Sequence, residues 1–289
     1  MAFEIGILAA FGAMICWGLG DFFIQRSTRK IGDVQSLAWI GLIGAVLLLP
    51  FVIGDLQLLV VKQNLWFLAA LGALGFAISL VTFEGFKQGK LSVVDVILEI
   101  ELPITIAFGI VFLSETVSLI QLAIISFVFV GIVLVALPVF SLKESFQKLE
   151  KGALLAIVAA LGMGAINFLT GVGAKTVSPF LVIWVPWVIM AVISLFIVWR
   201  REGFQNFFKN AAQNKKLIAC ESVLDTAAWM LFAIALVRHP VSITTAITES
   251  YPALAVLLGV WFNREKVQRH QLAGAGMAIV ASICLGFLV

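Results

Sequence analysis

Residues 92–122 read SVVDVILEIELPITIAFGIVFLSETVSLIQL, and residues 242–272 read SITTAITESYPALAVLLGVWFNREKVQRHQL. The two stretches lie 150 positions apart, and the polar identities carry the information because 62% of the chain is apolar. Nine positions match: Ser92/Ser242, Ile97/Ile247, Glu99/Glu249, Gly109/Gly259, Phe112/Phe262, Glu115/Glu265, Val117/Val267, Gln121/Gln271 and Leu122/Leu272. Internal repeats that meet at a polar site are typical of secondary transporters. The repeat therefore favours a transport function.

The composition excludes an ordinary soluble domain. The chain has 289 residues, of which only 12% are charged. Apolar runs of about 18–22 residues recur between short polar breaks, and each can cross the bilayer as a helix. We expect ten spans: 4–25, 33–53, 64–86, 91–113, 117–138, 151–173, 179–199, 216–237, 241–262 and 269–288. The sequence thus predicts an all-α polytopic membrane protein with ten transmembrane helices.

Each half of the chain contains five of these spans. Because five is odd, the second half must enter the membrane in the opposite direction. We therefore predict two inverted five-helix repeats, residues 1–140 and 151–289, joined by a cytoplasmic linker at 141–150.

Positive charge indicates how the chain is oriented. Of the 19 lysines and arginines, only Lys62, Lys175 and Arg238 lie at the breaks after the even-numbered spans. The positive-inside rule then places loops 26–32, 141–150 and 200–215 in the cytoplasm and both termini outside. We expect a multi-pass protein of the cell membrane, and no nucleic-acid partner, because this bias already accounts for the basic loops.

Acidic residues inside the fourth span form the first part of a candidate site. Asp95 and Glu99 lie one helical turn apart, and Glu101 follows. Carboxyl groups within a membrane are costly and usually functional. Pro103 lacks the backbone donor that would pair with the carbonyl of Glu99. A helix broken beside its acids is suited to a proton or an ammonium group.

The ninth span repeats this arrangement with Glu249 and Pro252, which leaves the carbonyl of Thr248 without its helical donor. Glu221 and Asp225 add a further pair in the eighth span. No basic residue lies deep enough to neutralise Glu99 or Glu249, so both are expected to carry protons at rest. The substrate- or proton-binding candidates are Glu99, Glu249, Glu101, Asp95, Asp225 and Glu221. For Glu115 and Glu265, at helix junctions, helix capping is a sufficient explanation.

Two further patterns each leave two interpretations open. Deep polar and aromatic residues either pack in the core or together line a cavity: Trp17, Asn167, Trp184, Trp187, Trp229 and Tyr251. Small residues at every fourth position allow close helix packing, either within the chain or across a homodimer: Gly274, Ala278, Ser282 and Gly286. Enzyme motifs are missing, including a phosphate-binding glycine loop, a paired zinc motif and a nucleophile with its base. We therefore expect no enzyme, metal or cofactor.

The chain resembles the drug/metabolite transporter superfamily, and specifically its EamA-type small-metabolite permeases. The resemblance spans nearly the whole chain and rests on Trp17-Gly18, on Ser114-Glu115-Thr116 through Gln121-Leu122, and on Arg264-Glu265-Lys266 through Gln271-Leu272. It implies a central cavity between the halves and a cargo such as amino acids, amines, sugars, nucleotide derivatives or drugs. The resemblance implies no need for so many buried acids, so we expect Asp95, Glu101, Glu221 and Asp225 to reflect something particular to this member.

The sequence therefore favours secondary transport of a small polar metabolite by alternating access, coupled to protons through the buried acids. The excess of membrane acids over bases favours an amine or amino acid as cargo. Two alternatives are an uncoupled facilitator of neutral metabolites and a non-transporting membrane scaffold whose acids are permanently hydrogen-bonded.

Overall fold

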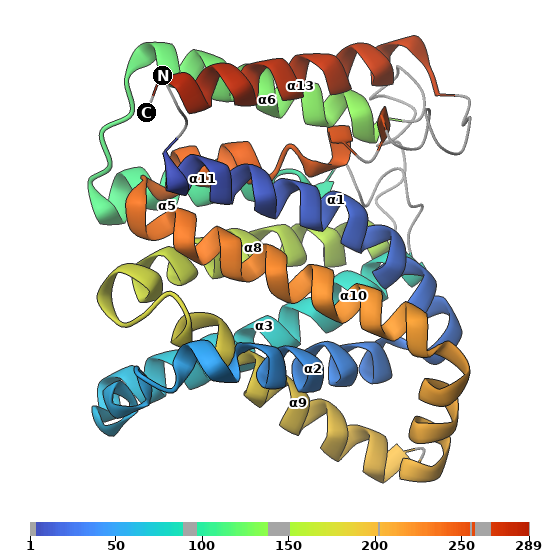
Figure 1. Ribbon diagram of the computed structural model, residues 1–289. Helices are drawn as coiled ribbons and strands as arrows, with labels where there is room; N and C mark the ends of the chain where they lie inside the picture. The colour runs from blue at the N-terminus through green and yellow to red at the C-terminus, as the bar shows by residue number, and fades with distance from the viewer. Residues whose placement is uncertain are drawn as a thin grey trace.

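The computed structural model describes residues 4–88, 97–137, 151–201, 203–254, 256–257 and 267–288. Helices dominate these residues and confirm the all-α class (Figure 1). They are α1 (Ile5–Ile31), α2 (Asp33–Val52), the short 3-10 helix η1 (Leu56–Val60), α3 (Lys62–Gln88), α5 (Glu101–Leu113), α6 (Leu119–Ala136), α8 (Lys151–Thr176), α9 (Leu181–Arg201), α10 (Phe204–Arg238), α11 (Val241–Thr248) and α13 (Arg269–Phe287).

Eight of these helices are long and apolar enough to cross a membrane. They correspond to eight of the ten predicted spans. The fourth and ninth predicted spans hold the shorter helices α5 and α11 instead. The chain is therefore a polytopic membrane protein, with two spans that are interrupted in the residues described.

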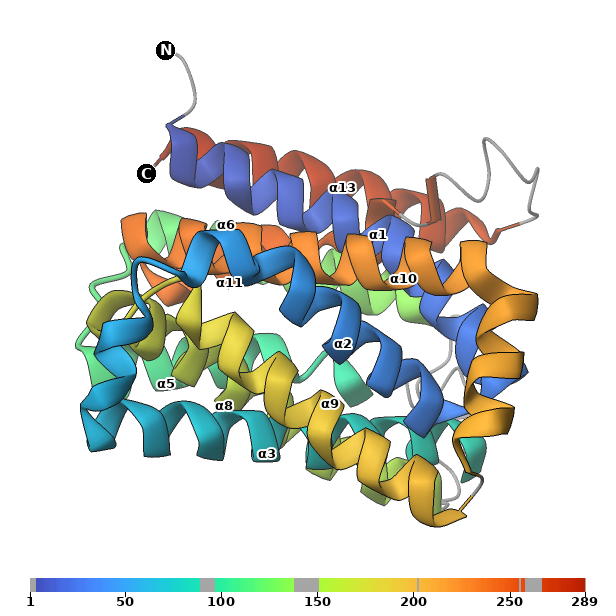
Figure 2. The same ribbon diagram turned by 60° about the horizontal axis from the view of Figure 1, so that its bottom comes forward.

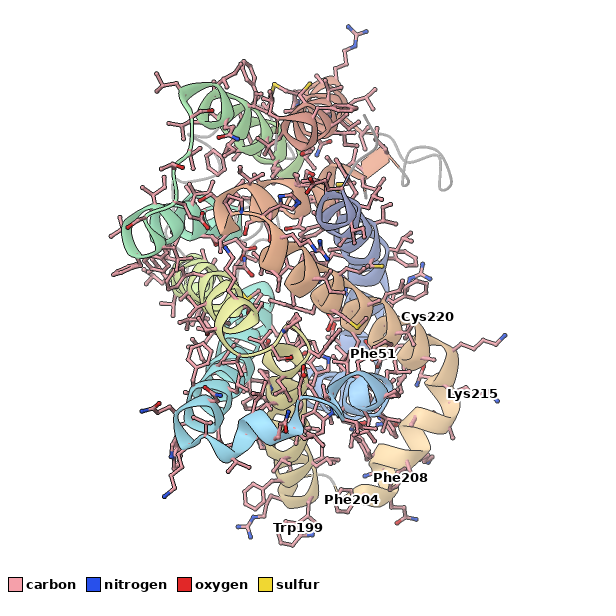
Figure 3. The ribbon with its side chains drawn as sticks, turned by 60° about the vertical axis from the view of Figure 1, so that its left-hand side comes forward. Phe51, Trp199, Phe204, Phe208, Lys215 and Cys220 are labelled. Carbon is pink, nitrogen blue, oxygen red and sulfur yellow. The ribbon has the colours of Figure 1, made fainter. Side chains whose placement is uncertain are left out.

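The predicted loop at 200–215 is wrong, because α10 already begins at Phe204. Asn214 has non-helical backbone angles and bends this helix, so residues 204–213 form an arm at an angle to the rest (Figure 3). The arm is held by Phe207, which is fully buried and stacks on Trp39 with 4.5 Å between the ring centroids. The aromatic side chains at 204–208 indicate a packed segment in the sequence, because an ordinary exposed loop would not carry them.

Contacts between the halves come in symmetric pairs, as an inverted repeat requires. The first helix of each repeat packs on the third helix of the other, α1 on α10 and α8 on α3. The fourth span of each repeat also packs on the first helix of the other repeat, α5 on α8 and α11 on α1. Three further contacts join equivalent helices, namely α2 with α9, α5 with α11 and α6 with α13. Figures 1 and 2 show α6 and α13 lying along one edge of the bundle.

Both chain termini lie at the same end of the bundle (Figures 1 and 2), which we call the terminal end. An even number of crossings gives this result. At the opposite end only Gly32 separates α1 from α2, and its φ of 85° is a value that glycine adopts without strain. Which end faces the cytoplasm stays a prediction from the charge distribution.

The stripe of small residues packs against α6 within the same chain. A Cβ on Gly274 would lie 2.6 Å from the carbonyl oxygen of Gly131, so the two backbones are in close contact. Ala278 and Ser282 are fully buried, and Gly286 is buried too. The stripe therefore makes the close contact within the chain that one of its two interpretations predicts. Homodimerisation itself stays a prediction.

Candidate functional site

The fourth and ninth spans are both interrupted beside their glutamates. Turns occupy Glu99–Ile100 and Glu249–Ser250, two pairs 150 positions apart. In each turn a backbone N–H bonds three residues back, Ile100 to the carbonyl of Ile97 at 3.1 Å and Ser250 to that of Ile247 at 3.3 Å. The predicted breaks are thus confirmed at matching positions.

One detail of the predicted break is wrong. The carbonyl of Glu99 was expected to lack a donor, because Pro103 has no N–H. In the structure it accepts from the N–H of Leu102 at 3.3 Å. The chain forms a tighter turn before Pro103. This turn brings the N–H of Leu102 to the carbonyl of Glu99, so the carbonyl has a donor within the membrane.

A glycine from the first helix of the opposite repeat abuts each break. A Cβ on Gly164 of α8 would lie 3.1 Å from the carbonyl oxygen of Glu101. A Cβ on Gly18 of α1 would lie 3.2 Å from the carbonyl oxygen of Tyr251, the equivalent position in the second repeat. The lack of a side chain on each glycine thus allows a helix of one repeat to pack on the broken span of the other.

The side chains of Glu101 and Glu249 hydrogen-bond to each other where the two repeats meet. Glu249 is 4% exposed and belongs to the second repeat, whereas Glu101 begins α5 of the first. An ionised carboxylate can only accept hydrogen bonds, so this bond requires a proton on one of the two groups. The structure therefore pairs Glu101 of the first repeat with Glu249 of the second.

Four acidic candidates remain. Glu99 is partly exposed in the turn before α5, and Asp95 lies outside the described residues. Glu221 on α10 is fully buried, and its two carboxyl oxygens accept hydrogen bonds from Ser27 and Ser36, each at 2.8 Å. Asp225 lies one turn further along α10 and is 8% exposed. Glu221 therefore ties α1 and α2 to α10, and a role for it or Asp225 in transport stays a prediction.

Four of the six cavity candidates form one aromatic cluster. Trp17 contacts both Trp229 and Tyr251, with ring centroids 5.2 Å and 6.3 Å away, and Trp187 contacts Trp229 at 5.9 Å. Trp184 lies apart and donates its indole N–H to the carbonyl of Ala45 at 2.9 Å. The cluster links α1, α9 and α10 with the residue that follows the second break. The sixth candidate, Asn167, is not aromatic and is described below.

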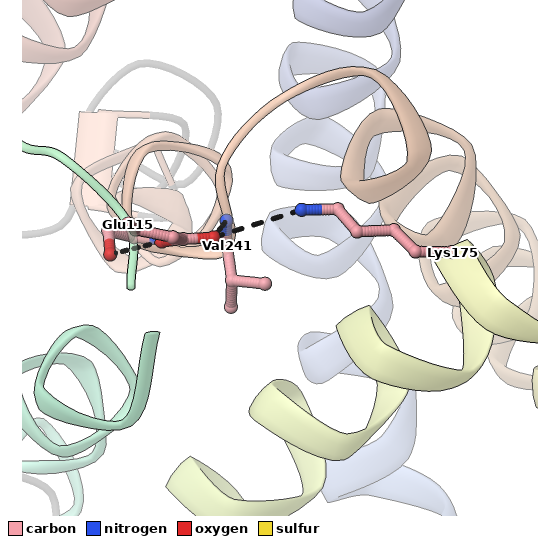
Figure 4. A network of polar contacts seen from close by, with 4 residues as sticks. Glu115, Lys175 and Val241 are labelled. Atoms are coloured by element: carbon pink, nitrogen blue, oxygen red, sulfur yellow. Dashed lines mark hydrogen bonds and ion pairs between the residues drawn. The ribbon is translucent and has the colours of Figure 1, made fainter. Parts of the chain in front are cut away.

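Glu115 has a role that differs from capping its own helix (Figure 4). Its carboxylate accepts hydrogen bonds from the backbone N–H of Val241 at 2.5 Å, and from the N–H and hydroxyl of Ser242 at 3.0 Å and 2.6 Å. The Nζ of Lys175 lies 3.8 Å from the same carboxylate. Glu115 thus caps α11 across the repeat boundary, near the terminal end. We call these contacts the Glu115 latch.

The glutamines of the repeat have a structural explanation. Gln121 forms a capping box with Ser118 at the start of α6, and Gln271 forms one with Gln268 at the start of α13. Such caps satisfy the donors at a helix start. The matching polar residues therefore serve two purposes, since the glutamines begin helices whereas Glu249 lies at a break and bonds across the repeats.

Sequence reasoning missed two residues of α11, Thr244 and Thr245. Each is at most 1% exposed, and neither hydroxyl has a hydrogen-bond partner among the residues described; the same is true of the amide nitrogen of Asn167. Threonines in an apolar helix are common, so their spacing gave no signal. Only the absence of partners distinguishes them.

Comparison with known proteins supports this architecture. The family model of the EamA-like transporter family matches residues 4–137 and again residues 150–287. An uncharacterized protein of Methanocaldococcus jannaschii is 28% identical over 137 residues, which are 47% of this chain and 96% of that protein. A solved crystal structure aligns with a TM-score of 0.77 over 99% of this chain and 98% of its own, at 16% identity. The archaeal protein therefore has about the length of one repeat, and the crystal structure shares the fold.

Proposed function

Because the chain belongs to the EamA-like transporter family, we propose that it is a secondary transporter that moves a small polar metabolite by alternating access and exchanges protons at Glu101 and Glu249. The observation that carries the proposal is the hydrogen bond between these two carboxyl groups, one from each repeat. Alternating access moves one repeat against the other around a fixed site. Separation of the repeats breaks this bond and changes what holds its proton.

The chemistry of the pair favours an amine or amino acid as cargo. With one shared proton the pair carries one negative charge, and without it two. An ammonium group that enters the site can replace the proton, because its N–H groups satisfy the same oxygens and its charge offsets the cost of a buried carboxylate. Proton and cargo then compete for one site, which couples their movements.

The Glu115 latch supports the alternating-access part of the proposal. It joins Glu115 of the first repeat to Lys175 and α11 of the second repeat at the terminal end. Opening that end requires these contacts to break. The positive-inside rule predicts that the terminal end is extracellular, and we infer that the latch closes this end to the outside.

Transport by proteoliposomes tests the proposal. Untargeted metabolite exchange identifies the cargo, and uptake is then measured with and without a pH gradient. We expect Glu101→Gln and Glu249→Gln each to abolish or severely reduce uptake, while an amide at either position keeps a hydrogen bond to the remaining glutamate and so preserves folding. The control is Glu4→Gln, at an exposed position just before α1.

Three other results contradict the proposal in different ways. Full, pH-dependent uptake by the double variant would show that the pair is not the proton site. Uptake with no pH dependence in the unmodified protein would favour the uncoupled facilitator. No movement of any metabolite would favour the scaffold.

Orientation and location in the cell membrane form a second part of the proposal, supported by the charge distribution. A cysteine at Asn206, in the exposed arm of α10, reports the side directly. We expect an impermeant thiol reagent to leave it unlabelled in intact cells and to label it in inverted vesicles. Labelling of intact cells would place the termini in the cytoplasm.

A further inference from the structure

Three buried polar groups near the carboxyl pair have no hydrogen-bond partner within the described part of the chain. They are the amide nitrogen of Asn167 and the hydroxyls of Thr244 and Thr245, all at most 1% exposed. Leaving one such group unsatisfied destabilises the folded chain, because the group has lost its hydrogen bonds to water. Three of them in one region of an apolar bundle require an explanation.

Helical spacing places the three groups on the sides of α8 and α11 that lie toward each other. A Cβ on Gly171 of α8 would lie 2.4 Å from Cγ2 of Val241, so the helices are in close contact there. Asn167 lies one turn before Gly171, and Thr244 and Thr245 lie one turn after Val241. Since α8 ends and α11 begins near the terminal end, both steps lead about 5 Å deeper from the same contact.

The carboxyl pair lies one helical turn further along the facing sides of α8 and α11. Glu249 follows Thr245 by four residues and so shares its helix face. On α8 the corresponding step leads from Asn167 to Gly164, whose Cβ position is 3.1 Å from the carbonyl oxygen of Glu101. The unpartnered groups and the pair are therefore separated by about one helical turn, or about 5 Å.

Ordinary helix chemistry does not explain the two threonines. A threonine in a helix commonly donates to the carbonyl four residues back. Thr82 and Thr105 do so here, at 2.9 Å each, to Ile78 and Glu101. Thr244 and Thr245 make no such bond, so their hydroxyls remain available to a ligand.

We propose that Asn167, Thr244 and Thr245 form a subsite that binds a hydrogen-bond acceptor of the cargo, while its amino group binds at Glu101 and Glu249. The unpartnered atom of Asn167 is a donor, and a hydroxyl can also donate, so the group bound there is a carboxylate or carbonyl oxygen. The cargo class is then an amino acid or a close relative, in which amine and oxygen are a few bonds apart. This inference rests on the proposed function.

The test compares an amino acid with the amine left when its carboxyl group is removed. Asn167→Leu and Thr245→Val remove the polar atoms at nearly constant volume. Each variant should raise KM for the amino acid about tenfold, the equivalent of one lost hydrogen bond, and leave KM for the amine within about twofold. Thr245→Ser keeps the hydroxyl and should keep KM, and Thr82→Val is the control for a hydroxyl with a structural bond.

Melting temperature in detergent separates binding from packing. Since the groups have no partner among the described residues, Asn167→Leu and Thr245→Val should not lower the melting temperature, but should lose the rise that the amino acid produces in the unmodified protein. Unchanged KM in both variants, or equal losses for the amine, would overturn the subsite and leave proton-coupled transport intact. If the unmodified protein transports neither compound and neither raises its melting temperature, the proposed function and the subsite fail together.

Discussion

Replacement of Glu115 tests whether the contact between the repeats stabilises the closed terminal end. Glu115→Ala removes three hydrogen bonds to a carboxylate and the contact with Lys175. Hydrogen bonds to charged groups contribute about 1.5–3 kcal/mol each, but these share one side chain, and loss of a helix cap costs about 0.5–2 kcal/mol. The ion pair adds under about 1 kcal/mol, because its length is 3.8 Å and Lys175 is one-third exposed. We expect a total loss of about 3 kcal/mol.

This loss corresponds to a fall in melting temperature of about 6 °C, at about 2 °C per kcal/mol for a chain of this length. Thermal unfolding in detergent, followed by tryptophan fluorescence, gives the value. Glu115→Gln keeps an acceptor and should lose less than half as much. Lys175→Met removes only the ion pair and should lower the melting temperature by no more than about 2 °C.

Ser118→Ala is the matched comparison, because Ser118 caps α6 with a neutral hydroxyl from its own segment. Its loss should be about 1 kcal/mol. Hydrogen exchange adds a local measurement, since the amides of Val241 and Ser242 should exchange faster in Glu115→Ala while those of α6 should not. If Glu115→Ala costs no more than Ser118→Ala, or if exchange near Val241 is unchanged, the reasoning about the latch is refuted.

Three further predictions concern packing, pH and a buried acid. Gly131→Leu places a side chain against the backbone of α13 and should destabilise the protein by at least about 1–3 kcal/mol, whereas Gly276→Leu, whose Cβ meets open space, should not; equal melting temperatures would contradict this. Burial lowers the pKa of His239 below its ordinary 6.5, with Arg238 and Lys175 lowering it further and Glu4 opposing them. The unfolded chain therefore binds the proton first, so stability should fall as pH drops below about 6.5 and level off below the folded-state pKa, and His239→Gln should remove that contribution from the pH-dependent melting curve. Glu221→Ala leaves two buried serine hydroxyls without an acceptor and should cost more than Glu221→Gln in the same unfolding assay, and the opposite order would refute the tie.

The sequence by itself determined the membrane class, the repeat and the broken spans. Apolar runs long enough to span a bilayer have few other solutions, because every backbone group in lipid must be paired internally. Pro103 and Pro252 mark the breaks for a local reason, the missing N–H, and the 150-residue register follows from the polar identities. These features are patterns of residue type along the chain, so they can be recognised in the sequence without a structure.

Only the tertiary structure decided which side chains meet. Sequence register relates Glu99 to Glu249, and the structure adds that Glu101, two residues further on, bonds to Glu249. Glu115 looked like a local cap and instead caps α11 of the other repeat. That Thr244 has no partner in the described part of the chain depends on which groups the neighbouring helices place beside it, and no spacing along one helix reveals this. Contacts between distant segments are set by how the helices pack, and that information lies in the fold of the whole chain.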